Sequence, residues 1–201
     1  MFPATRLRLP GAALLLALGL TLAQVPPAAA APSEPPKSTL PQVWPQPKSM
    51  HAGPGRLTVP ERVVAVVGRG TDPAARRVVE TVLRDAGAKR IVTVAKPPAK
   101  AGFTVFLGGP KENIATASAL KRLKASSPAG LPSGGYVLAS GRGDGRTLLA
   151  LSGTDRTGTF HAARTLRQLV TRTVPVVTVR DWPTAALRGV IEGFYGTVPR
   201  D

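Results

Sequence analysis

The stretch VVAVVGRGTDPAARRVVETVLRDAG, residues 63–87, places a strand, a turn and a helix in direct succession. Its opening apolar run is rich in β-branched residues, a pattern typical of a strand buried on both faces of a sheet. Gly68 ends that run, Asp72 is placed to cap a helix, and Pro73 suits the first helical position, where its missing N–H costs nothing. Apolar residues then recur at helical spacing for about 14 residues until Gly87, a residue typical of a helix C-terminus.

Strands and helices continue to alternate on both sides of this unit. We expect strands within 56–68 and at 91–94, 103–107 and 174–179, helices at 114–123 and 157–170, and a hairpin of 136–139 with 148–151 around the turn pair Asp144-Gly145. This order predicts an α/β (α+β) fold, a mixed β-sheet with helices packed on it, over residues 48–183, with a first edge near Val43 and Trp44.

Composition limits what the chain does. It has no cysteine, which excludes disulfide bonds and cysteine-based zinc sites, and its histidines, His51 and His161, are too few for a histidine-rich metal centre. We therefore expect neither a metal nor a cofactor. The net charge of +16 favours anionic partners in general, but the basic residues are scattered and no aromatic residues are interleaved with them, so we expect no nucleic-acid binding.

The N-terminus has the pattern of an export signal. Two arginines precede an apolar run at 11–23, which is shorter than the roughly 20 residues needed to span a bilayer. Three alanines at 28–30 then supply a small-residue cleavage site. We expect residues 1–30 to be a signal peptide cut near Ala30, the mature protein to be secreted without a stable membrane anchor, and the proline-rich residues 31–47 to form an extended linker.

The segment RGVIEGFYG, residues 188–196, reads as a separate short strand. It resembles the opening strand of the catalytic barrel in glycoside hydrolase family 84, which contains β-N-acetylglucosaminidases and the so-called hyaluronidases of bacteria. GYVL at 135–138, GTDRTGTFH at 153–161 and LRQL at 166–169 look like that family's N-terminal domain, and DWP at 181–183 resembles the element that leads into the barrel. Hexosaminidases of family 20 have the same type of N-terminal domain, but their barrels open without EGFYG.

This resemblance implies a hexosaminidase-type N-terminal domain followed, at 184–201, by the first strand of a truncated (β/α)8 barrel. It also implies removal of β-linked N-acetylglucosamine by substrate-assisted catalysis. In that reaction the substrate's own N-acetyl oxygen attacks the anomeric carbon, and two adjacent aspartates assist. By the same resemblance, the carbonyl of Gly193 receives a sugar hydroxyl and Tyr195 lines the substrate pocket, while Glu192 has no catalytic role.

The sequence contains no Asp-Asp pair, and TVPRD at 197–201 departs from the Pro-Trp that usually follows the motif. We therefore expect no catalytic residue in this chain and no activity by it alone. Its expected partners are N-acetylglucosamine-containing glycans and the catalytic barrel of the same protein, which is missing here. The alternative is a secreted, non-catalytic module that binds carbohydrate or a polyanion.

Weaker signals are interpreted as structural. The tripeptide RGD at 142–144 matches an integrin-recognition motif, but a glycine-rich hairpin turn accounts for it. The glycines of GGP at 108–110 hint at a phosphate cradle, yet their spacing fits no nucleotide-binding motif, so packing is preferred. His161 is interpreted as a half-buried structural histidine. Trp44 and Trp182 both adjoin prolines at domain edges, and packing is preferred there over stacking on a sugar.

Overall fold

The computed structural model describes residues 42–99 and 102–185. The predicted signal peptide and the segment 188–196 lie outside these residues, and their expectations stay predictions. In chain order the elements are β1 (Ser49–Thr58), β2 (Arg62–Val67), α1 (Pro73–Asp85), β3 (Arg90–Val94), β4 (Phe103–Leu107), α2 (Ala115–Arg122), β5 (Tyr136–Gly143), β6 (Arg146–Gly153), α3 (Arg156–Leu169) and β7 (Thr173–Asp181).

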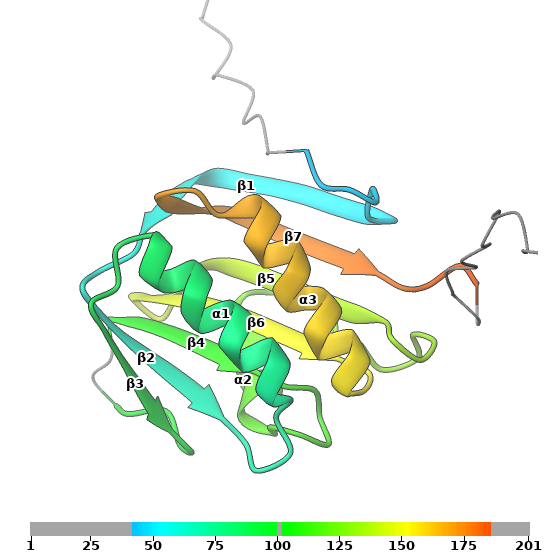
Figure 1. Ribbon diagram of the computed structural model, residues 1–201, viewed down its shortest axis with the longest axis horizontal. Coiled ribbons are helices and arrows are strands. Elements are labelled where there is room, and N and C mark those ends of the chain that lie inside the picture. The colour runs from blue at the N-terminus through cyan, green and yellow to red at the C-terminus, as the bar shows by residue number, and fades with distance from the viewer. Residues whose placement is uncertain (1–41, 100–101, 186–201) are drawn as a thin grey trace, which may run out of the picture. The chain divides into compact units, whose positions relative to one another are not determined.

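These strands form one 7-stranded sheet in the order β1-β7-β5-β6-β4-β2-β3 (Figure 1). β2 runs parallel to β3 and β4, and β4 runs parallel to β6. β5 is antiparallel to both β6 and β7, and β1 is antiparallel to β7. A mixed sheet with helices packed on it confirms the predicted fold class.

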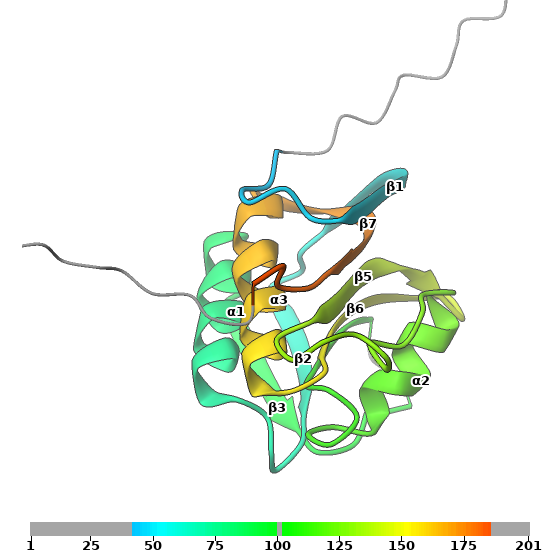
Figure 2. The ribbon, with the colours of Figure 1, turned by 90° about the vertical axis from the view of Figure 1, so that its right-hand side faces the viewer.

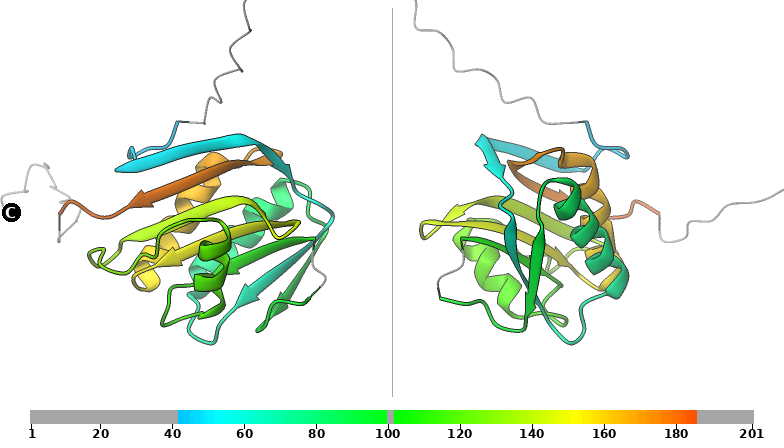
Figure 3. Two further views of the ribbon diagram at one scale, coloured as in Figure 1. Left: turned by 180° about the vertical axis from the view of Figure 1, so that it is seen from behind. Right: turned by 60° about the vertical axis from the view of Figure 1, so that its left-hand side comes forward.

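Helices cover the two faces of the sheet unequally. α1 and α3 lie side by side on one face, and α2 lies on the other (Figures 2 and 3). Neighbouring residues of β2 show the consequence, because Val63 packs in the core beneath α1 and α3 while Val64 packs in the core beneath α2. The strand is therefore buried on both faces, as its apolar run predicts.

Several local signals are confirmed by backbone geometry. The Asp72 carboxylate accepts a hydrogen bond from the backbone N–H of Ala75 at 2.7 Å and so caps α1. Gly87, just past that helix, has a φ of 116°, which a side chain rarely tolerates. Asp144 and Gly145 both have positive φ, at 50° and 72°, as the expected hairpin turn requires.

The strands at the β1 edge differ from the prediction in extent. β1 begins at Ser49, although the sequence shows strand character only from residue 56 onward, and it contains an irregularity between Ala52 and Arg56. The hairpin is also longer than predicted, because Ser140–Gly143 pairs with Arg146–Leu149. These residues are polar or glycine at several positions. Their pairing rests on backbone hydrogen bonds, and no alternation of apolar and polar residues in the sequence predicts it.

The chain packs on this domain from Val43 onward, since that side chain is only 3% exposed. Because β1 follows at the sheet edge and pairs with β7, the first and last described strands run side by side at one edge of the sheet. Among the helices of the described residues, none combines the length and apolar character that crossing a membrane requires.

Candidate functional site

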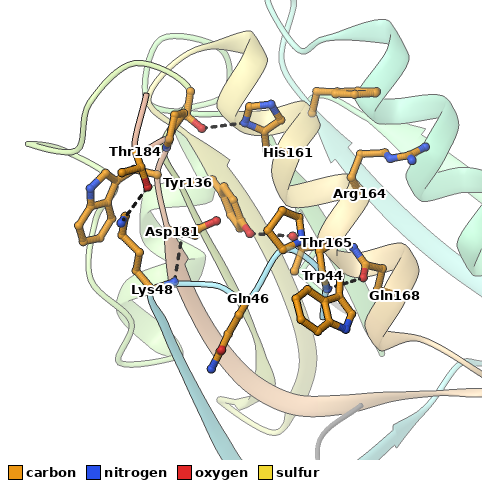
Figure 4. A pocket seen from close by; sticks show the side chains of 15 residues that line it. Trp44, Gln46, Lys48, Tyr136, His161, Arg164, Thr165, Gln168, Asp181 and Thr184 are labelled. Carbon is orange, nitrogen blue, oxygen red and sulfur yellow. Dashed lines mark hydrogen bonds between the residues drawn. The ribbon is translucent and has the colours of Figure 1, made fainter. Parts of the chain in front are cut away.

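The residues predicted to bind sugar, Gly193 and Tyr195, lie outside the described residues, as does Glu192. Their roles stay predictions. Within residues 42–185, a hollow of about 390 Å³ opens between the segment before β1, the helix α3 and the end of β7 (Figure 4). We call it the tryptophan pocket, because its lining includes both Trp44 and Trp182.

Trp44 is fixed to α3 through its backbone rather than its ring. Its N–H donates to Oε1 of Gln168 at 2.8 Å, and Nε2 of Gln168 donates to its carbonyl oxygen at 2.9 Å. The residue is nevertheless 68% exposed, so the prediction that Trp44 packs into the domain is wrong. Both backbone hydrogen bonds go to a side chain 124 positions away, and they hold the indole out beside the pocket.

The opposite side of the pocket is organised around Lys48. Its backbone N–H donates to Oδ1 of Asp181 at 3.2 Å, and its Nζ donates to Oγ1 of Thr184 at the same distance. The ammonium also lies 5.2 Å from the centre of the Trp182 ring, within the range of a cation–π interaction. Lys48 thereby joins the start of β1 to the end of β7.

Tyr136 and Thr165 form a buried part of the lining. The Tyr136 hydroxyl and Oγ1 of Thr165 are 2.7 Å apart and share a hydrogen bond. Burial, reinforced by the negative charge of Asp181, raises the pKa of Tyr136 to about 12. The phenol is therefore neutral at physiological pH and serves as a hydrogen-bonding group rather than as a base.

His161 is half-buried beside the pocket, as the sequence predicts, and its Nδ1 lies 3.0 Å from the carbonyl oxygen of Gly134. Across the described ranges, no cluster of three or more His, Cys, Asp or Glu side chains is placed to hold a metal ion. The pocket thus presents aromatic rings, two cations (Lys48 and Arg164), a carboxylate and side-chain amides.

A second cluster lies where the parallel strands β2, β4 and β6 end, the edge at which ligands often bind in such sheets. Here backbone fills the space. A Cβ on Gly109 would meet the carbonyl oxygen of Gly153 at 2.0 Å, and a Cβ on Gly68 would meet that of Glu112 at 1.7 Å. The packing interpretation of GGP at 108–110 is therefore confirmed.

The Glu112 carboxyl completes this cluster. Oγ1 of Thr159 donates to its Oε2 at 3.0 Å, while its Oε1 is buried without a hydrogen-bond partner among the described residues. Burial raises the pKa of Glu112 above its ordinary value, although the hydrogen bonds from Thr159 and from the backbone near Gly109 oppose the rise. The carboxyl ties the loop after β4 to the first turn of α3.

Comparisons with known proteins agree on the fold. The family model for glycosyl hydrolase family 20, domain 2, matches residues 40–182. The solved structure of CpGH84B superposes with a TM-score of 0.61 and 23% identity, over 78% of this chain and 25% of that one. The solved structure of CpGH84D superposes with a TM-score of 0.63 and 19% identity, over 80% of this chain and 26% of that one. A glycoside hydrolase family 20 β-N-acetylglucosaminidase has a TM-score of 0.46 and 22% identity, over 74% of this chain and 24% of that one. This chain thus spans about a quarter of the length of the solved proteins it matches.

Proposed function

This chain belongs to the family of glycosyl hydrolase family 20 domain 2 proteins, and from that premise we propose that it is the non-catalytic N-terminal domain of an exported β-N-acetylglucosaminidase. Within the glycosidases we assign the parent enzyme to family 84. The string EGFYG at 192–196 supports this assignment, and the solved structures with the higher TM-scores carry the name of that family. Cleavage of the leader near Ala30 and secretion are part of the same proposal.

The observation that carries the proposal is the position of the tryptophan pocket. Its lining includes Trp182, Pro183 and Thr184, so the residues that follow β7 begin directly beside it. Those residues, 184–201, are the ones predicted to start the catalytic barrel. The Trp44 indole is 68% exposed beside these residues, and an exposed apolar surface of that size is typical of a contact site. We therefore assign the pocket as the contact surface for the barrel.

On this account the domain supports catalysis without performing it. Its sequence contains no Asp-Asp pair for substrate-assisted hydrolysis, and the neutral phenol of Tyr136 offers no base. The barrel would supply the aspartates, while Gly193 and Tyr195 would contribute to the sugar pocket at the end of its first strand. The substrate class is a glycan with terminal β-linked N-acetylglucosamine.

A substitution in the longer protein tests the contact. The protein to test is this domain expressed together with the coding sequence that follows it. In that protein, Trp44→Ala should lower the thermal midpoint of the barrel by several degrees, because an aromatic side chain of the interface is lost. Ile114→Ala is the matched control, since Ile114 is an apolar side chain that is 83% exposed at the N-cap of α2, at the other face of the sheet. Equal effects of the two substitutions would contradict the assignment.

A further inference from the structure

The sheet face opposite α1 and α3 is only partly covered. α2 packs over β4 and β6 on that face. The left view of Figure 3 shows that β1 and β7 carry no described helix there. Between the end of α2 and the irregular part of β1 lies a groove of about 700 Å³, whose floor is formed by residues of β5 and β7. We call this the basic groove.

Its charge is one-sided. Four permanently cationic side chains line it, and all are exposed: Arg56, Arg122, Lys124 and Arg142. His51 adds an imidazole ring, and none of the described residues lining the groove is acidic. These residues come from β1, β5, the last residue of α2 and the turn after it, so the cations gather only because the fold brings three segments together.

Local contacts hold two of the arginines. Arg56 donates through Nε to Oγ1 of Thr173 at 2.5 Å and through a terminal nitrogen to the carbonyl oxygen of the same residue. Nε of Arg122 lies 3.2 Å from Oδ2 of Asp144, an exposed ion pair at the groove's rim. A guanidinium has five N–H donors, so each arginine keeps others for a ligand carboxylate.

Lys124 occupies a position where glycine is the usual residue. After α2, the N–H of Ala125 bonds the carbonyl of Leu120 at 2.9 Å, and the N–H of Lys124 bonds that of Lys121 at 3.1 Å. This is the Schellman pattern, and its left-handed residue is Lys124, with φ of 55°. A side chain in that conformation is unfavourable relative to glycine, so Lys124→Gly should relieve backbone strain while it removes a cation from the groove.

We propose that the basic groove binds an acidic polysaccharide, a glycan chain bearing repeated carboxylates. Charge complementarity carries the assignment, since arginine forks match carboxylates in a bidentate manner. Among the described residues that line the groove there is no Phe, Tyr or Trp to stack on bases, which disfavours single-stranded nucleic acid. The choice of a glycan rests on the proposed function. A binding assay needs no catalysis, so this inference and that function can fail separately.

Fluorescence anisotropy of a labelled alginate oligosaccharide, a chain of uronic acids, tests the proposal with the full chain at low ionic strength. Binding should weaken as salt is added, and neutral dextran should not compete. Replacing the groove arginines, R56Q/R122Q/R142Q, should raise the Kd about tenfold. The charge-matched control R77Q/R84Q/R90Q, on α1 and β3, should change it less than about twofold.

Equal losses in the two triple variants would show that net charge alone binds the polymer and would overturn the proposal. So would tighter binding of a single-stranded oligodeoxynucleotide than of alginate, or no alginate binding at all. Lys124→Gly adds a test in which weaker binding cannot be attributed to unfolding, because this variant should be more stable than the parent. It should raise the thermal midpoint by about 2–4 °C while weakening alginate binding. A variant that is stabilised yet binds as tightly as the parent would remove Lys124 from the site.

Discussion

Gln168 of α3 grips the backbone of Trp44 from both sides, donating to its carbonyl oxygen at 2.9 Å and accepting from its N–H at 2.8 Å. This reciprocal pair joins residues that are 124 positions apart and sets the exposed indole beside the tryptophan pocket. One side-chain amide satisfies both backbone groups because it carries a donor and an acceptor together.

Gln168→Glu should release this segment. A carboxylate keeps an acceptor for the N–H of Trp44 but turns its second oxygen toward the carbonyl, where it repels. The free energy of unfolding should fall by about 1 kcal/mol, and the Trp44 amide should exchange with solvent faster. Hydrogen exchange resolved to single residues measures this. Unchanged protection of the Trp44 amide would show that the two bonds do not hold the segment.

Asp155 should make the domain acid-sensitive. Partial burial alone would raise the pKa of Asp155, but hydrogen bonds from the N–H groups of Gly158 and Gly134 and from the hydroxyl of Ser133 together lower it below its ordinary value of 3.8. A carboxyl with a lowered folded pKa stabilises the fold above its unfolded pKa. That stabilisation disappears as the pH falls through the folded value, so the loss should occur below about pH 4.

Asp155→Asn should destabilise the domain by about 1–2 kcal/mol at neutral pH, because its side-chain NH2 would face N–H or O–H donors whose hydrogen bonds a carboxylate oxygen accepts in the parent. It should also flatten the loss of stability in acid. Urea unfolding at a series of pH values measures both effects. Asp85→Asn, at the exposed end of α1, serves as the control, because it replaces a carboxyl that takes no part in the hydrogen bonds to Asp155.

Glu112 should act in the opposite direction. Its folded pKa is raised above 4.5, chiefly by burial, so the folded protein holds the proton more tightly than the unfolded chain does. Stability therefore falls as the pH rises from about 4.5 through the folded pKa. Glu112→Gln removes the titration and should stabilise the domain at pH 7 relative to the parent, because folding then no longer has to bury a charged carboxylate. If the stability difference between the two proteins does not change with pH, burial of this carboxyl is not coupled to folding.

Gly153 should tolerate no side chain. An added Cβ would lie 2.1 Å from the backbone N of Thr159 and 2.5 Å from the carbonyl oxygen of Asp155, so the first turn of α3 would have to move. Gly153→Ala should cost about 2–3 kcal/mol in chemical denaturation. Gly102→Ala has nothing within 4 Å of the new Cβ and should be nearly neutral. A neutral Gly153→Ala would mean that α3 and β6 can separate at little cost.

Sequence patterns predict those parts of this fold that depend on neighbours along the chain. The helix capped by Asp72 follows from side-chain chemistry within one turn, and the strand at 103–107 is bounded as expected. β1 is different, because its first residues show no apolar alternation and are ordered by pairing with β7, more than 100 positions away. Pairing across such distances is decided by the whole sheet.

The candidate sites follow the same division. Trp44 and Trp182 are identifiable from sequence as aromatic residues at domain edges, but the exposure of Trp44 depends on Gln168, which no local pattern links to it. The basic groove is less predictable still. Arg56, Arg122 and Arg142 belong to separate elements, and along the sequence they look like scattered charges. Their convergence is a property of the tertiary fold.

The most direct test of the account is hydrolysis of 4-nitrophenyl N-acetyl-β-D-glucosaminide by two proteins. One is the chain of 201 residues alone, and the other is the same chain joined to the coding sequence that follows it in its gene. The account predicts release of nitrophenol by the joined protein and none by the chain alone. Release by the chain alone, or a joined protein that folds and releases none, would contradict it.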